Sequence, residues 1–391
     1  MKSRFRFFGG ASLGAAFLMA NSSIGPGFLT QTTVFTQQLL TSFGFVILVS
    51  VILDVGAQLN TWRILTVSEL RAQDLANRLL PGLGYFLAAM VILGGFAFNI
   101  GNIAGCGLGL NVLTGMSFEK GALISCAVAL TLFWVREIGK MLDGFTKILG
   151  TVKILLTLGI AFSAHPPLLQ ALHHTLLPVK ISAAAIVTIV GGTVGGYITF
   201  SGAHRLLDAG IKGPENQAAV TRSAVSGIVI STIMRFVLFL AIVGVLSHGA
   251  VLEADNPAAG EVGFRIFGVI LWSAAISSVV GAAYTSVSFF KTFHPLFARY
   301  ERACISVFIL LSTGIFVLIG KPTQLLVFAG AINGLILPIA LGIVLVAATS
   351  RRLMHGYQHP RWMLAAGWVV VVVMGGLSVP VLVQQVGAFL R

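Results

Sequence analysis

The most regular feature of the chain is a series of long apolar runs separated by short polar connections. An α-helix needs about 20 mostly apolar residues to cross about 30 Å of hydrocarbon, and most of these runs approach or exceed that length. The pattern predicts an all-α membrane protein with about eleven transmembrane helices in a single domain over residues 1–391. The apolar runs lie near 8–40, 42–62, 83–112, 119–135, 144–163, 182–203, 223–247, 264–290, 303–320, 324–348 and 363–388.

Two of the predicted helices, the first and the sixth, contain residues that interrupt helices. The first has a Gly-Pro-Gly sequence near its middle, and the sixth gathers four glycines within IVGGTVGGYITFSG. Proline removes a backbone donor and glycine lowers helix stability, so both helices should unwind locally. Unwound backbone at membrane depth is tolerated where it is buried or lines a cavity. The residues concerned are Gly25, Pro26, Gly27, Gly191, Gly192, Gly195 and Gly196.

The two breaks are five helices apart, which predicts an internal repeat. Because five is an odd number, consecutive five-helix repeats have opposite orientations in the membrane. We expect a first repeat over 8–163, a second over 182–348 and an extra helix at 363–388. Breaks at matching places in inverted repeats are typical of secondary transporters. The alternative is that glycines only allow close helix packing, which is the role we assign to Gly101, Gly105, Gly107 and Gly109.

The distribution of charge fits a membrane protein with a defined orientation. Only 9% of the residues are charged and 57% are hydrophobic, whereas soluble domains have about 25% charged residues. With a cytoplasmic N-terminus, 18 of the 25 basic residues fall in cytoplasmic segments, in six groups of three. The positive-inside rule therefore predicts that the N-terminus is cytoplasmic and the C-terminus external. We expect a monomer in a bacterial cytoplasmic membrane, with the lipid bilayer, a substrate and a coupling cation as partners.

Several other classes of protein are disfavoured. The net charge of +13 comes from short clusters between apolar runs, which does not indicate a nucleic-acid partner. No hydrolase, metalloprotease or phosphate-loop motif is visible, so we expect neither an enzyme nor a cofactor. The three cysteines lie in apolar segments, and the histidines of 165–178 are interpreted as part of an outer loop, so we expect no resident metal site. The apolar start of the chain resembles a signal peptide but is interpreted as the first helix.

Charged residues within the predicted helices are candidates for ion coupling. They are Asp54 in the second helix, Lys153 in the fifth and Arg235 in the seventh. An intramembrane charge costs at least about 2.5–3.5 kcal/mol, so it persists mainly where it is paired or functional. Asp54 either pairs with Arg235 or carries the coupling proton, whereas for Lys153 and Arg235 we favour a structural role. His204, at the inner end of the sixth helix, is a weaker candidate for a proton relay, because a lone histidine there is more often solvated.

Three stretches of the sequence resemble the natural resistance-associated macrophage protein (Nramp) family of proton-coupled divalent metal transporters. They are TVSELRAQDLANRL after the second helix, GGTVGGYITFSGAHRL in the sixth and AAISSVVGAAYTSVSFF in the eighth, and the similarity covers most of the chain. The resemblance implies a LeuT-type fold with inverted repeats and eleven or twelve transmembrane helices. It also implies secondary active transport by alternating access.

The chain departs from this family at the motifs that bind metal. Relatives have Asp-Pro-Gly-Asn in the first helix, whereas residues 25–28 read Gly-Pro-Gly-Phe. Relatives have Met-Pro-His in the sixth helix, whereas residues 195–197 read Gly-Gly-Tyr. An acidic pair that the family uses for proton passage is replaced by Asn99 and Asn102. Without carboxylate or thioether ligands at either break, a dehydrated divalent ion would bind poorly.

A small organic solute fits this centre better than a metal ion. The second half of each broken helix presents its N-terminus to the centre, which favours a carboxylate. We therefore favour import of a carboxylate or amino-acid-like solute, for instance 5-oxoproline, coupled to H⁺ or Na⁺. The alternatives are a Mg²⁺ or Mn²⁺ transporter with altered ligands, and either a channel or a membrane scaffold that transports nothing. The expected substrate-binding residues are Gly25, Pro26, Gly27, Phe28, Gln31, Asn99, Asn102, Thr193, Gly195, Gly196, Tyr197 and Thr199.

Overall fold

A computed structural model describes residues 14–16, 19–20, 22–134, 155, 157–159, 161–247 and 260–389. Over these residues the chain folds into helices without a β-strand, which confirms the predicted all-α class. The helices of the first half are α2 (Pro26–Leu39), the 3₁₀ helix η1 (Leu40–Ser42), α3 (Phe43–Ser68), α4 (Ala72–Leu79), α5 (Leu83–Thr114) and α6 (Phe118–Trp134).

The second half begins with a short helix that precedes the second broken span. Its helices are α8 (Leu168–Leu176), α9 (Ala183–Val194), α10 (Ile198–Asp208), η2 (Pro214–Asn216), α11 (Gln217–Ser247), α12 (Gly260–Phe290), α13 (Leu296–Arg299), α14 (Glu301–Ile319), α15 (Pro322–Ala348) and α16 (Arg361–Phe389). The predicted sixth helix is therefore two helices, α9 and α10, with three residues between them.

The transmembrane segments agree with the predicted array. Within the described residues, eight segments are long and apolar enough to cross a membrane. One of them, Pro26–Ser68, contains the second half of the first predicted helix and the whole of the second, which the chain separates by a change of direction at Leu40 (φ 51°, ψ −133°). The fourth corresponds to α6, with 17 residues, and the fifth lies largely outside the described residues. The repeat boundaries at 8–163 and 182–348 stay a prediction.

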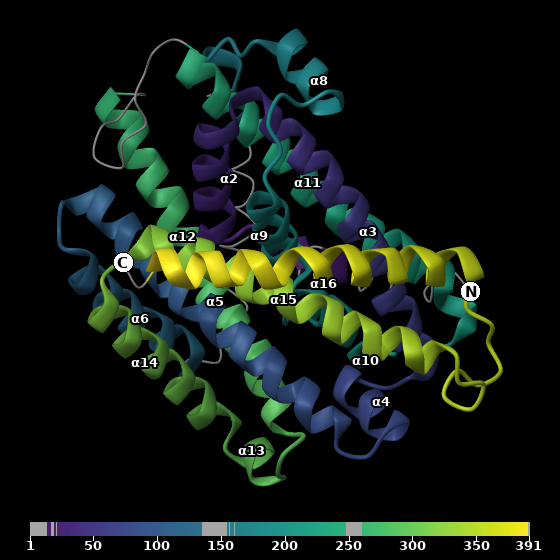
Figure 1. Ribbon diagram of the computed structural model, residues 1–391. Coiled ribbons are helices and arrows are strands. Elements are labelled where there is room, and N and C mark those ends of the chain that lie inside the picture. The colour runs from purple at the N-terminus through teal and green to yellow at the C-terminus, as the bar shows by residue number, and fades with distance from the viewer. Residues whose placement is uncertain are drawn as a thin grey trace, which may run out of the picture.

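Figure 1 shows how the short helices mark two ends of the molecule. Helix α8 lies at the top of the view, whereas α4 lies at the lower right and α13 at the bottom. The topology predicted from charge places α8 on the outer side and α4 and α13 on the cytoplasmic side. The arrangement of the helices is compatible with that prediction.

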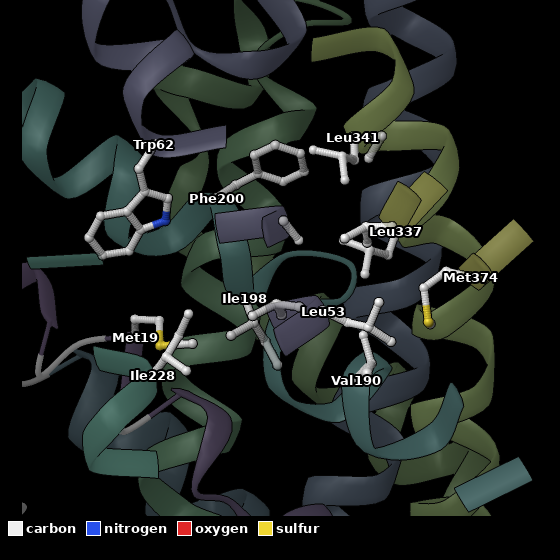
Figure 2. Packing of buried hydrophobic residues seen from close by; sticks show 14 of the residues in the cluster. Met19, Leu53, Trp62, Val190, Ile198, Phe200, Ile228, Leu337, Leu341 and Met374 are labelled. Carbon is white, nitrogen blue, oxygen red and sulfur yellow. The ribbon is translucent and has the colours of Figure 1, made fainter. Parts of the chain in front are cut away.

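The second half of the broken sixth span, α10, lies inside the molecule. Figure 2 shows Ile198 and Phe200 of α10 between Trp62 of α3 and Leu337 of α15. The Trp62 indole also donates from Nε1 to the Thr199 carbonyl oxygen at 2.8 Å. A Cβ atom at Gly202 would lie 2.1 Å from the Trp62 ring, so only glycine allows this close approach. Packing on both sides therefore fixes the position at which α10 begins.

Candidate functional site

The first break lies where the sequence places its Gly-Pro-Gly motif. The chain bends at Ile24 and Gly25, and Gly25 is extended (φ −98°, ψ −171°). Helix α2 then begins at Pro26, where the missing N–H and the fixed φ of proline are compatible with a first helical position. Pro26 packs on α5, because a Cβ atom at Gly105 would lie 2.2 Å from the Pro26 Cβ. This close contact supports the packing role predicted for Gly105.

The second break spans the three residues between α9 and α10. Gly195 is extended (φ −76°, ψ 161°) and Gly196 has a positive φ of 53°. A Cβ atom at Gly196 would lie only 1.6 Å from the Asn333 Oδ1 of α15. Backbone conformation and space both require glycine here, so the break is a fixed feature of the sequence.

Gln31 connects the two broken spans to α15. Its Nε2 donates to the Leu326 carbonyl oxygen at 2.8 Å. A Cβ atom at Gly192 would lie 2.5 Å from Gln31 Oε1, and one at Gly330 would lie 2.6 Å from Gln31 Nε2. The Gln31 side chain is fully buried, and its Oε1 accepts no hydrogen bond. The structure therefore brings this predicted site residue close to both breaks.

The two asparagines of α5 approach the breaks from the other side. Asn99 donates from Nδ2 to the Ser312 hydroxyl at 3.1 Å. Asn102 lies near Gly25, since a Cβ atom at Gly25 would be 3.5 Å from Asn102 Oδ1. Tyr197 is fully buried and packs edge-to-face on Phe98 with ring centroids 5.9 Å apart. The residues at the positions of the family's acidic pair thus belong to the site but carry no charge.

Many buried polar atoms around the breaks have no hydrogen-bond partner in the protein. A buried unsatisfied donor or acceptor costs about 1–3 kcal/mol, and native proteins keep few of them. Others lie elsewhere, as Gln73 Oε1 and Gln217 Oε1 do, but eight surround the two breaks, which makes the breaks the candidate site where a bound molecule supplies the partners. The atoms are Gln31 Oε1, Asn99 Oδ1, Asn102 Nδ2, Tyr197 Oη, Thr199 Oγ1, Ser278 Oγ, Ser286 Oγ and Asn333 Oδ1.

Of the two described intramembrane charges, Arg235 contacts both broken spans and Asp54 interacts with Arg235. Asp54 and Arg235 are buried and interact electrostatically. The Arg235 guanidinium donates from Nη1 to the Thr193 hydroxyl at 2.9 Å and lies 4.2 Å over the Phe28 ring. Asp54 Oδ1 accepts no hydrogen bond. Phe28 and Thr193, both predicted site residues, are thus held together by a charged side chain.

The remaining two candidates for ion coupling lie elsewhere. His204 is buried, accepts a hydrogen bond from Ala72 N–H at 3.3 Å and stacks on Phe200. The expectation that a histidine at this position is solvated is therefore wrong, because α4 and aromatic rings cover it. It joins α10 to the start of α4 and lies eight residues after Gly196, on the part of α10 that leads away from the second break. Lys153 lies outside the described residues.

Comparison with known proteins identifies the family of this chain. A model of that family, described as Natural resistance-associated macrophage protein-like, matches residues 16–384. The chain belongs to the Nramp family. It is 56% identical to the membrane protein YcsG of Bacillus subtilis over 380 residues, which cover 95% of this chain and 94% of the relative.

Solved structures extend the comparison to the fold. A manganese transporter of Eremococcus coleocola matches with a TM-score of 0.78 at 17% identity, covering 97% of this chain and 87% of that one. MhsT in complex with L-phenylalanine matches with a TM-score of 0.61 at 13% identity, covering 95% and 97%. These similarities confirm the LeuT-type fold with its inverted repeats and broken first and sixth spans. As an Nramp protein, the chain is a secondary transporter in a membrane.

In this structure, other groups occupy the space around the positions that carry the metal-binding motifs in the Nramp family. Gly25 leaves room that the Ser278 hydroxyl occupies, since a Cβ atom there would lie 2.8 Å from Ser278 Oγ. Phe28 carries the Arg235 guanidinium on its ring. Among the described residues, no group of three or more His, Cys, Asp or Glu side chains is arranged to hold a metal ion.

Three polar residues at the site were not predicted from the sequence: Asn333, Ser278 and Ser286. Asn333 donates from Nδ2 to the carbonyl oxygens of Gly94 at 3.0 Å and Ala329 at 2.8 Å. It is the one amide in the middle of the apolar α15, and this isolation was a usable signal. Ser278 and Ser286 lie in the eighth span, where serines also commonly bond to their own helix, so their position in the sequence does not distinguish them.

Proposed function

We propose that this Nramp transporter imports a small organic carboxylate or amino-acid-like solute, such as 5-oxoproline, by alternating access coupled to H⁺ or Na⁺. The observation that carries the proposal is the set of uncharged, unsatisfied amide and hydroxyl atoms at the two breaks. Such groups recognise the polar edges of an organic molecule, and Phe28 and Tyr197 offer aromatic surface to its apolar part. Asp54 is our candidate for the coupling group.

The alternative substrate is a divalent cation such as Mn²⁺ or Mg²⁺. The similarity to a manganese transporter supports the fold of this alternative but not its ligands. Divalent ions favour carboxylate oxygens, and the residues at the breaks offer amides, hydroxyls and a nearby guanidinium instead. A fixed positive charge beside Phe28 also opposes a dication. The cation is therefore the second candidate.

The cellular setting of the proposal follows from the charge pattern. A bacterial cytoplasmic membrane, a cytoplasmic N-terminus and an external C-terminus agree with the asymmetry of basic residues. We propose that the monomer is the transporting unit, since the residues at both breaks come from one chain.

Titration of the purified full chain separates the two substrates. Melting curves with a panel of small carboxylates that includes 5-oxoproline should show stabilisation, and at 100 times the dissociation constant this is about 2.7 kcal/mol. Gly195→Val should remove the effect, because a Cβ atom at Gly195 would lie 2.5 Å from the Gly191 carbonyl oxygen. Calorimetric binding of Mn²⁺ or Mg²⁺ that is lost on changing Gly25 or Gly195 would overturn the proposal in favour of the cation.

A further inference from the structure

Arg235 occupies an unusual place for an arginine. It lies in the middle of α11, is 4% exposed, and α11 packs against both α2 and α3. An arginine at this depth is costly unless its charge and its donors are used. The charge interacts with Asp54, but the donors are only partly used.

The hydrogen bonds of the guanidinium leave one of its edges open. Nη1 donates to Thr193 of α9, and the ring of Phe28 in α2 lies under the guanidinium plane, so the group touches both broken spans. Nε and Nη2 are buried and have no hydrogen-bond partner. These two nitrogens carry parallel N–H groups on the same edge, which is the geometry that binds a carboxylate with two hydrogen bonds.

Asp54 compensates the charge of Arg235 without occupying this edge. The Asp54 Oδ1 makes no hydrogen bond, so the pair is electrostatic. The other elements packed on α3 near the breaks, α2, α9 and α15, contain no charged residue. The titratable groups of the remaining neighbours of α3 lie elsewhere on those helices. They are His204, Arg205 and Asp208 in α10, Asp74 and Arg78 in α4, His173 and His174 in α8, and Arg361 at the start of α16. Arg235 is thus the charge that interacts with Asp54 among the described residues.

We propose that the Nε–Nη2 edge of Arg235 is the receptor for the carboxylate of the transported solute, which makes Arg235 the residue that selects an anionic substrate. The inference deepens the proposed function and rests on it. The half-helix N-termini at the breaks contribute partial charge, whereas Arg235 contributes a full charge and two directed donors. Phe28 positions the guanidinium by a cation–π contact.

A carboxylate bound at Arg235 also gives a physical reason for coupling its transport to a proton. The Asp54–Arg235 pair has no net charge, so an arriving carboxylate brings one uncompensated negative charge into a buried site. A proton taken up by Asp54 restores neutrality, and the anion and the proton then move together. Both charges are released when the site opens to the other side. The neutral amide of the same solute needs no such proton.

The experiment compares an acid with its amide on purified full chain, using 5-oxoproline and 5-oxoprolinamide as probes. Wild type should bind the acid and not the amide in calorimetry. Arg235→Gln should weaken binding of the acid at least about 100-fold, because a buried charge-assisted contact is removed. Arg235→Lys should keep only part of the wild-type affinity for the acid, since an ammonium lacks the two-donor edge. Arg222→Gln, an exposed position on the same helix, is the matched control and should bind as wild type does.

A double variant controls for the possibility that Arg235→Gln alone unfolds the protein. Removing Arg235 alone leaves Asp54 as an uncompensated buried charge, so Asp54→Asn is combined with Arg235→Gln to restore neutrality. The double variant should melt near wild type and still fail to bind the acid. Retained binding of the acid by a folded Arg235→Gln or double variant, or equal binding of acid and amide by wild type, would overturn this inference alone. Stabilisation of wild type by Mn²⁺ and by no carboxylate of the panel would overturn the proposed function as well.

Discussion

Two polar regions of this transporter are built in opposite ways. At the centre, amide and hydroxyl atoms from α2, α5, α10, α12 and α15 converge without hydrogen-bond partners. At the end formed by α4 and the end of α10, charged side chains are paired, as Arg71 is with Asp208 at 2.8 Å and Lys212 is with Glu69. The first arrangement is unfavourable for the protein alone and favourable for a complex. The second holds the protein itself together.

The comparison separates residues that bind from residues that support. A polar side chain that already has its partners gains little from a ligand, whereas an unsatisfied one in the same chain gains a full hydrogen bond. We therefore expect substitutions at the centre to change transport more than stability. Substitutions at the α4–α10 end should change stability slightly and leave substrate affinity intact.

The largest effect is expected from Gly196→Ala. The residue has a positive φ, and the new Cβ atom would collide with Asn333 Oδ1, so the break between α9 and α10 must change shape. Strain of this kind costs about 1–3 kcal/mol, and we expect uptake of the substrate to be lost. Uptake into proteoliposomes measures the effect. Gly281→Ala in α12, where a Cβ atom meets nothing within 4 Å, is the control and should transport normally.

Asp54→Asn should come next, with loss of ion coupling. The change removes the group that we propose as the proton acceptor and leaves Arg235 uncompensated. Uptake should fall at least about 10-fold and lose its dependence on an imposed pH gradient, because the remaining transport carries no proton. Asp74→Asn, an exposed position on α4, should retain the dependence. Intact proton-dependent uptake in Asp54→Asn would exclude this residue as the coupling group.

Tyr197→Phe tests the central region more finely, since it removes only one unsatisfied hydroxyl. The ring remains buried against Phe98, so the melting temperature should stay the same or rise. Substrate affinity should fall by about 5- to 100-fold, which corresponds to about 1–3 kcal/mol for a lost hydrogen bond to the substrate. Calorimetry and melting curves on the same preparation measure both quantities. A lower melting temperature with unchanged affinity would make the hydroxyl structural.

The sequence was sufficient to predict the long-range architecture. Apolar runs of membrane length and the residues around Pro26 and Gly196 have strong local signatures, so the class and the broken spans followed from them. The residues of other helices that contact the broken spans could not be predicted from these local signatures. Asn333 reaches Gly196 only because α15 packs on α9, and His204 is buried only because α4 folds over it. Such contacts depend on the tertiary arrangement, which local patterns do not contain.

A smaller effect, on stability alone, is expected at the connection between α15 and α16. His359 bonds through Nε2 to Asn60 Oδ1 at 2.9 Å, and burial together with Arg63 lowers the pKa of His359 to about 4. In the unfolded chain its pKa is about 6.5, so the unfolded state binds more protons between these two values. Stability should therefore fall as the pH is lowered from about 6.5 to about 4.

The corresponding measurement is the melting temperature of the full chain at pH 7 and pH 5. His359→Gln should reduce the difference between the two, because the side chain no longer titrates. His355→Asn, at an exposed position of the same connection, should leave the difference unchanged. A slope that persists in His359→Gln would assign the pH dependence to another group.

The smallest effect is expected from the paired end of the molecule. Arg71 and Asp208 are 31% and 51% exposed, and an ion pair of this kind contributes about 0–1 kcal/mol. Arg71→Ala should lower the melting temperature by less than about 3 °C, and exchanging the two residues as Arg71→Asp with Asp208→Arg should recover most of it. Substrate affinity should not change in either variant, because both side chains already have their partners. A drop in affinity without a drop in stability would mean that this end also contributes to binding, and the separation between the two regions would fail.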